Sequence, residues 1–208
     1  MNSNAAAEHL QVIRTLMERA ALYRRALAPI TLFTGGVGVL AGIVAFSFHV
    51  ETLRAFGAFW LCVAVIAVAG AFLLARRQSL KDREPFWSPP TRRVAQALLA
   101  PLTVGLLVSA ISIAGASSQD KADVALPVVW MLCYGCALHA AGFFAPRGVR
   151  LLGWFFILCA CGVFCTLFSP EPLRNAAAAN IVMGIFFGVV HLVYGTYFHF
   201  TEKQKDAA

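Results

Sequence analysis

Six long apolar runs, none of which contains Asp, Glu, Lys or Arg, dominate this chain of 208 residues. An apolar run of about 18 or more residues can cross the hydrocarbon layer of a bilayer as a helix. A helix satisfies its own backbone hydrogen bonds, as hydrocarbon requires. The runs therefore predict an all-α, polytopic integral membrane bundle of six transmembrane helices, at Leu27–Phe48, Ala55–Ala75, Val94–Gly115, Ala125–Ala145, Leu151–Phe168 and Ile181–Phe200.

The composition agrees with membrane insertion. Hydrophobic residues make up 60% of the chain and charged residues 13%, whereas a soluble domain averages about 45–50% and about 25%. These proportions exclude a disordered chain, a disulfide-rich secreted domain and an ordinary cytosolic enzyme. The first apolar run begins after residue 26 and is longer than the core of a signal peptide, so we expect an uncleaved first span.

The cations are divided unevenly between the two sides of such a bundle. Fourteen of the 17 Lys and Arg residues lie in residues 1–26, 76–93, 146–150 and 201–208, which six spans place on one side. Cytoplasmic segments carry the excess of Lys and Arg, so both termini are expected in the cytoplasm and the protein in the inner membrane. This topology accounts for the net charge of +7 without a nucleic-acid partner.

Residues 1–26 form a separate unit ahead of the transmembrane domain, residues 27–200, and the tail, residues 201–208. Between residues 5 and 26 the apolar side chains share one helical face, which predicts an amphipathic cytoplasmic helix. Such a helix lies in the headgroup region or docks on a protein partner. Repeated Ala-Pro pairs at Ala28 and Ala100, each followed by Trp60 or Trp130, suggest helical hairpins repeated in parallel.

The longest polar connection, residues 76–93, holds Phe86 and Trp87 among charged residues. Two interpretations are open for these rings. They belong to the aromatic belt at the membrane interface, or they form a docking loop for a cytoplasmic protein partner or for a second copy of the chain.

Small residues recur at helical spacing in three of the predicted spans. Pairs separated by four residues let two helix backbones approach closely. The sequence therefore predicts helix-packing faces that contain Gly38, Gly42, Gly135, Gly142, Gly184, Gly188 and Gly195.

Two histidines, His139 and His191, lie within predicted spans and on the faces that carry these glycines. Polar side chains within a membrane often mark functional sites, and one interpretation is that the two imidazoles line a shared ligand-binding pocket together with Tyr134 and Tyr194. The interpretation that we favour is structural, with each imidazole hydrogen-bonded across helices to a hydroxyl such as that of Tyr134 or Tyr194.

The sequence contains no motif typical of hydrolysis or acyl transfer, and no catalytic residue is predicted. The six cysteines all lie within predicted spans, where they behave as small packing residues. No metal site is expected apart from haem, should His139 and His191 ligate one.

Three classes of function fit these features. The first, which we favour, is a non-enzymatic membrane module that binds a ligand or partner and works by changing helix packing. The second is a transporter or channel for a neutral or lipid-like small molecule. The third is a redox protein that holds haem between two histidines.

Overall fold

A computed structural model describes residues 26–83, 85–168 and 175–206, and this part of the chain is helical throughout apart from its connections. An isolated bridge between Thr52 and Lys121 joins two of these connections. The all-α prediction is confirmed for these residues. The helices are Ala26–Ser47, α2 (Leu53–Lys81), α3 (Pro89–Gly115), α4 (Ala125–Ala141), α5 (Arg147–Thr166), α6 (Ala176–Met183), the π-helical segment η1 (Gly184–Val189) and α7 (Val190–Asp206).

Five helices in the described ranges are long and apolar enough to cross a membrane. They are Ala26–Ser47, α2, α3, α5 and the continuous helix formed by α6, η1 and the first part of α7 up to Phe200. The remaining helix, α4, is apolar but has 17 residues. These helices indicate a multi-pass membrane protein.

Several helix ends differ from the apolar runs. α2 continues to Lys81 and α3 begins at Pro89, because charged residues extend a helix beyond the hydrocarbon and proline is tolerated in a first turn. α4 ends four residues before the predicted limit at Ala145: the Gly142 N–H bonds to the Leu138 carbonyl, and Pro146 caps the next helix. The predicted amphipathic helix lies outside the described residues.

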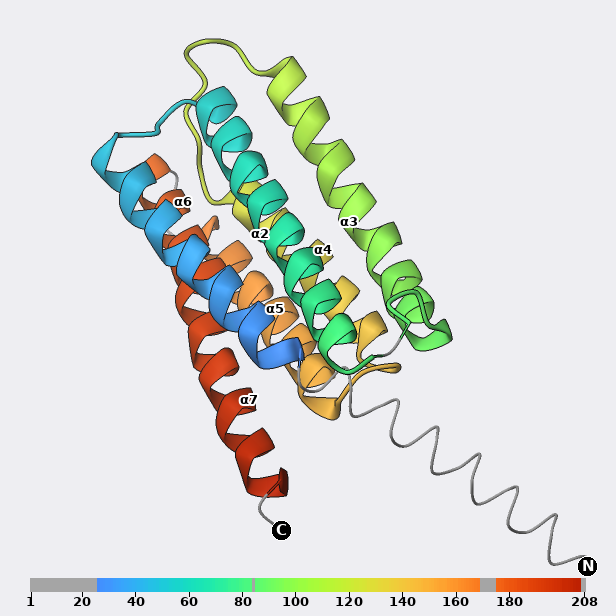
Figure 1. The fold of residues 1–208 in the computed structure, drawn as a ribbon. Coiled ribbons are helices and arrows are strands. Elements are labelled where there is room, and N and C mark those ends of the chain that lie inside the picture. Colours follow the sequence, from blue (N-terminus) through green and yellow to red (C-terminus); the bar gives the residue numbers. More distant parts are fainter. Residues whose placement is uncertain (1–25, 84, 169–174, 207–208) are drawn as a thin grey trace, which may run out of the picture.

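Successive long helices run in alternate directions, and α3 lies at the edge of the bundle (Figure 1). Helix Ala26–Ser47 starts at the end of the bundle where α7 finishes. α4 packs between α3 and α5. The described chain therefore enters and leaves the bundle at the same end.

A glycine seam joins helix Ala26–Ser47 to the C-terminal helix. A Cβ atom added at Gly42 would lie 2.9 Å from the Cα of Gly184, and one added at Gly38 would lie 2.8 Å from the Cα of Gly188. These distances are shorter than any real Cβ contact, so only glycine permits the backbones to come this close. The predicted packing faces of the first and last spans are thus partners of each other.

The seam continues toward the end of the bundle at which the described chain starts. A Cβ at Gly35 would lie 2.6 Å from the backbone nitrogen of Leu192, and one at Gly195 would lie 2.9 Å from that of Leu32. The contacts follow a constant antiparallel register. Backbone-to-backbone contact of this kind replaces the hydrophobic driving force that is missing between helices in lipid.

A second seam joins α4 to α5. A Cβ at Gly135 would lie 2.9 Å from the carbonyl oxygen of Gly153, and one at Gly142 would lie 2.6 Å from the Cβ of Arg150. Gly153 lies against the backbone of His139: a Cβ added at Gly153 would lie 2.5 Å from the backbone nitrogen of His139. The predicted face of α4 is therefore covered by α5, and it does not meet the face that carries His191.

Candidate functional site

The C-terminal helix contains a π-helical segment, Gly184–Val189, between α6 and α7. Within it the hydrogen bonds run from residue i to i−5, as from the Val190 N–H to the Ile185 carbonyl. A π-turn accommodates one extra residue and is rare in α-helices, where it is often found at functional sites. The regular spacing used to predict a single stripe from Gly184 to Gly195 is therefore interrupted.

His191 lies directly after this segment and is almost completely buried, with 1% of its surface exposed. Its Nδ1 atom is 3.1 Å from the Phe186 carbonyl oxygen, and its Nε2 atom is 2.8 Å from the hydroxyl oxygen of Tyr134 on α4. A carbonyl oxygen can only accept, so Nδ1 carries the proton. In the neutral ring Nε2 is then an acceptor, and the Tyr134 hydroxyl donates to it.

The resulting chain runs from the Tyr134 hydroxyl through the His191 imidazole to the Phe186 carbonyl. It connects α4 to the π-segment and occupies both ring nitrogens. The interhelical hydrogen bond expected as the structural alternative is thus present for His191, with Tyr134 as its partner.

Aromatic rings enclose His191. The Phe156 ring on α5 has its centroid 5.5 Å from that of the imidazole, and Phe187 stacks on it at 6.2 Å with 17° between the planes. Tyr134 also packs edge-on against Phe156, at 5.0 Å. In such apolar surroundings an unpaired polar atom is expensive, so the hydrogen-bonded chain holds α4 and the C-terminal helix in one arrangement, with Phe156 of α5 packed against both.

His139 lies elsewhere. Its ring is half-buried between Phe143 and Trp154, with centroids at 5.4 and 5.1 Å. Its Nδ1 atom is buried and has no hydrogen-bond partner among the described residues. Five positions separate Tyr134 from His139, which is about 140° around an α-helix. Because Tyr134 faces α7, His139 faces away from it, and the structure does not bring the two histidines into one pocket.

Tyr194 has a different partner from the one expected. Its hydroxyl donates to the carbonyl oxygen of Gly148, in the first turn of α5, at 2.6 Å. The backbone carbonyl, rather than an imidazole, is the acceptor within reach. Tyr194 thus ties α7 to α5 near the cation-rich end of the bundle.

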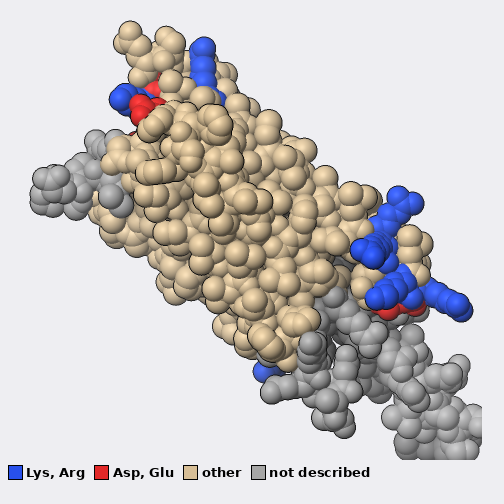
Figure 2. All heavy atoms as spheres, turned by 60° about the vertical axis from the view of Figure 1, so that its left-hand side comes forward, with Lys and Arg blue, Asp and Glu red and all other residues tan. Residues whose placement is uncertain are grey.

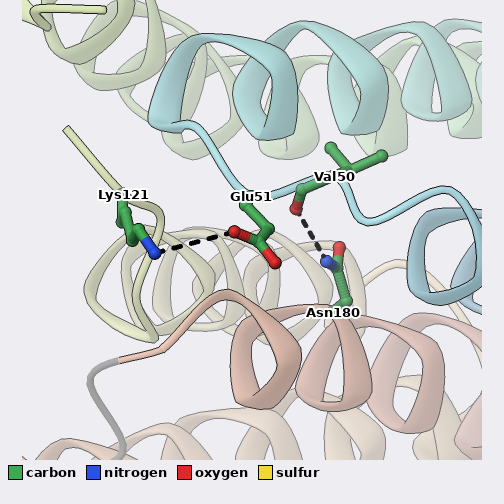
Figure 3. A network of polar contacts seen from close by, with 4 residues as sticks. All are labelled: Val50, Glu51, Lys121 and Asn180. Carbon is green, nitrogen blue, oxygen red and sulfur yellow. Dashed lines mark hydrogen bonds and ion pairs between the residues drawn. The ribbon is translucent and has the colours of Figure 1, made fainter. Parts of the chain in front are cut away.

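Sequence reasoning missed Asn180, which is buried in α6 at the opposite end. Its Oδ1 atom accepts from the Trp60 indole N–H at 3.0 Å, and its Nδ2 atom donates to the Val50 carbonyl at 3.0 Å. Beside it the Lys121 ammonium lies 3.7 Å from a Glu51 carboxylate oxygen (Figure 3). The sequence did contain a signal for this residue, because the Asn180 side-chain amide directly precedes the apolar run Ile181–Phe200.

Two further polar contacts involve α3, α4 and the connection between them. The Trp130 indole N–H donates to the buried Ser109 hydroxyl at 2.6 Å and joins α4 to α3. In the connection before α4, the Ser117 backbone N–H donates to Asp120 at 2.6 Å, and this bond lowers the pKa of the Asp120 carboxyl.

Two observations bear on metal and haem binding. Within the described ranges no three His, Cys, Asp or Glu side chains are grouped so that they could hold a metal ion. Haem ligation by His191 would require breaking one of its two hydrogen bonds. The six cysteines are free thiols, and Cys133 packs near Gly105.

Comparison with known proteins adds no relative: no family model matches the chain, and neither a curated protein nor a solved structure is significantly similar to it. The function must therefore be argued from the geometry described above.

Proposed function

We propose that this protein is a six-span membrane module, with both termini in the cytoplasm, that binds a ligand or partner and responds by changing its helix packing. The observation that carries the proposal is the hydrogen-bonded chain from Tyr134 through His191 to the π-segment. This chain is one of the buried polar networks of the bundle, and it joins α4 to the C-terminal helix.

The six-span topology is supported by the course of the chain and by its charges. The helices alternate in direction (Figure 1), and Lys and Arg side chains gather at one end of the described surface (Figure 2). α4, at 17 residues, is about 25 Å long. The apolar residues 142–145, which follow the helix, lengthen the apolar segment toward the roughly 30 Å of hydrocarbon. On this proposal both ends of the chain lie on the cation-rich side, which faces the cytoplasm.

The π-segment provides a means of changing the packing. The part of the C-terminal helix before the π-segment is held by Asn180, which bonds to Trp60 and Val50, and the part after it is held by His191. Conversion of the π-turn to a regular α-helix would rotate one half against the other by about 100°. Because Gly184 and Gly188 lie against helix Ala26–Ser47, such a rotation would also disturb the glycine seam.

The topology is tested with reporter fusions in cells. A cytoplasmic reporter attached after residue 206, or inserted at residues 85–88, is expected to be active, and a reporter that needs export is expected to be active when it is inserted within residues 117–121. Activity of the exported reporter at the C-terminus would contradict the six-span arrangement.

The coupling is tested with a single cysteine at Val50, introduced after the six native cysteines are replaced. Tyr134→Phe removes one interhelical hydrogen bond, worth about 1 kcal/mol, and should raise the rate of maleimide labelling at position 50 about twofold to fivefold. Tyr197→Phe removes the same atom from a ring that is 54% exposed and serves as the control. Equal labelling rates in the two variants would show that the Tyr134–His191 bond is structural only.

A further inference from the structure

The connection between α2 and α3 is the most strongly charged part of the described chain. Six cations lie on it and on the adjoining helix ends, all of them exposed, and within the described residues none of them forms an ion pair. They are part of the Lys and Arg cluster at one end of the molecule (Figure 2). The six, here called the basic cluster, are Arg76, Arg77, Lys81, Arg83, Arg92 and Arg93.

Helix stability does not explain all of these cations. Arg92 and Arg93 lie close to the N-terminus of α3, whose first turn contains no acidic residue. The helix macrodipole disfavours positive charge at that position. An external anion would offset the unfavourable placement.

Two aromatic rings lie beside the basic cluster. Phe86 packs edge-on against Phe72 of α2, with centroids 5.0 Å apart, and Trp87 stacks on Phe86 at 6.3 Å. Trp87 is 61% exposed, and Phe72 is 49% exposed on the apolar surface of α2. The connection is thus folded back so that its rings meet the lipid-facing side of the helix at the level of the cations.

One environment suits both sets of side chains. Clusters of about four to eight Lys and Arg residues next to a membrane helix bind anionic lipids, and Trp is enriched where hydrocarbon meets headgroups. A cytoplasmic protein could match the charge, but it would have to reach the bilayer boundary to cover rings that pack on Phe72.

We infer that the basic cluster binds anionic phospholipid headgroups, with the arginines on the phosphates and Trp87 in the interfacial layer. This inference extends the proposed function, because it names a partner for the connection between α2 and α3. It rests on the proposed topology in one respect only, which is that the bound lipids belong to the cytoplasmic leaflet.

The test uses the full chain in nanodiscs that contain equal amounts of phosphatidylglycerol and phosphatidylcholine, followed by analysis of the lipids that co-purify in detergent. The wild type should retain phosphatidylglycerol in excess of the bulk ratio. R92Q/R93Q should weaken phosphatidylglycerol binding at least about fivefold, since one cation near the surface is worth roughly that factor. W87A should weaken it by a smaller factor.

R147Q/R150Q is the matched control, because it removes the same charge from the first turn of α5 at this end of the bundle. It should change phosphatidylglycerol binding less than about twofold. Equal losses in the two double variants would mean that net charge alone attracts the lipid, and this result would overturn the inference. A wild type that shows no preference between the two lipids would also overturn the inference, because the basic cluster would then have to serve another partner, such as an acidic protein.

Folding is monitored by gel filtration and melting. Should R92Q/R93Q fail to fold, a salt titration of the wild type decides the matter: the preference should fall toward the bulk ratio at about 1 M NaCl, where the Debye length is about 3 Å. A preference that persists at this salt concentration would also overturn the inference. Both leaflets of a nanodisc have the same composition, so the result is independent of whether the proposed topology holds.

Discussion

Gly38→Ala is expected to destabilise the bundle severely, while Gly36→Ala, two residues away on the same helix, is expected to be harmless. The Cβ of an alanine at position 38 would fall on the backbone of Phe187, with the carbonyl oxygen as its nearest atom. A backbone cannot rotate away as a side chain can, so the two helices must separate. Overpacking of this kind costs about 1–3 kcal/mol and occasionally more.

At Gly36 an added Cβ meets nothing within 4 Å. Alanine is also a better helix former than glycine, by up to about 1 kcal/mol. The free energy of unfolding, measured by titration with a denaturing detergent, should therefore stay the same or rise for Gly36→Ala. If the two variants unfolded at the same detergent concentration, the glycine seam would not hold the first and last helices together.

His191→Ala is expected to have the second large effect. The substitution leaves a cavity in the most buried part of the bundle and removes the partner of both the Tyr134 hydroxyl and the Phe186 carbonyl. Cavity formation and the lost hydrogen bonds together should lower the free energy of unfolding by about 2–4 kcal/mol. Tyr134→Phe loses the hydroxyl alone and should lower it by about 1 kcal/mol.

The control for this prediction is His199→Ala on the same helix. The His199 side chain is exposed, so its loss should change the free energy of unfolding by no more than about 0.5 kcal/mol. Melting of the purified variants gives the comparison. A His191→Ala protein as stable as the His199→Ala protein would show that the hydrogen bonds of the buried imidazole do not hold the helices together.

Much of the fold could be predicted because hydrophobicity is a local property. Each apolar run predicted a helix, and helices occupy all six places in the structure. The ends were harder to predict, since α2 and α3 extend into charged sequence that hydropathy counts as a loop. α4 ended early because Gly142 and Pro146 terminate it, a backbone effect that outweighs the apolar residues between them.

The candidate site was predicted in part. An interhelical hydrogen bond between an imidazole and the hydroxyl of Tyr134 or Tyr194 was expected, and the structure has it between His191 and Tyr134. Which histidine meets Tyr134 depends on how α4 is rotated, and that rotation turns His139 away from His191. Asn180 was overlooked because its significance lies in its partners, Trp60 and Val50, which are remote in sequence.

The sequence by itself determined that the chain forms apolar helices suited to a membrane, where the cations accumulate, and which helix faces carry the small residues needed for close packing. Each of these follows from residue types at a regular spacing along one helix. Only the tertiary structure decided that Gly38 and Gly42 meet Gly188 and Gly184, and that a π-turn sets His191 against Tyr134. Those features depend on the complementary shapes of helices distant in the chain, and one extra residue in a turn leaves no mark on an apolar pattern.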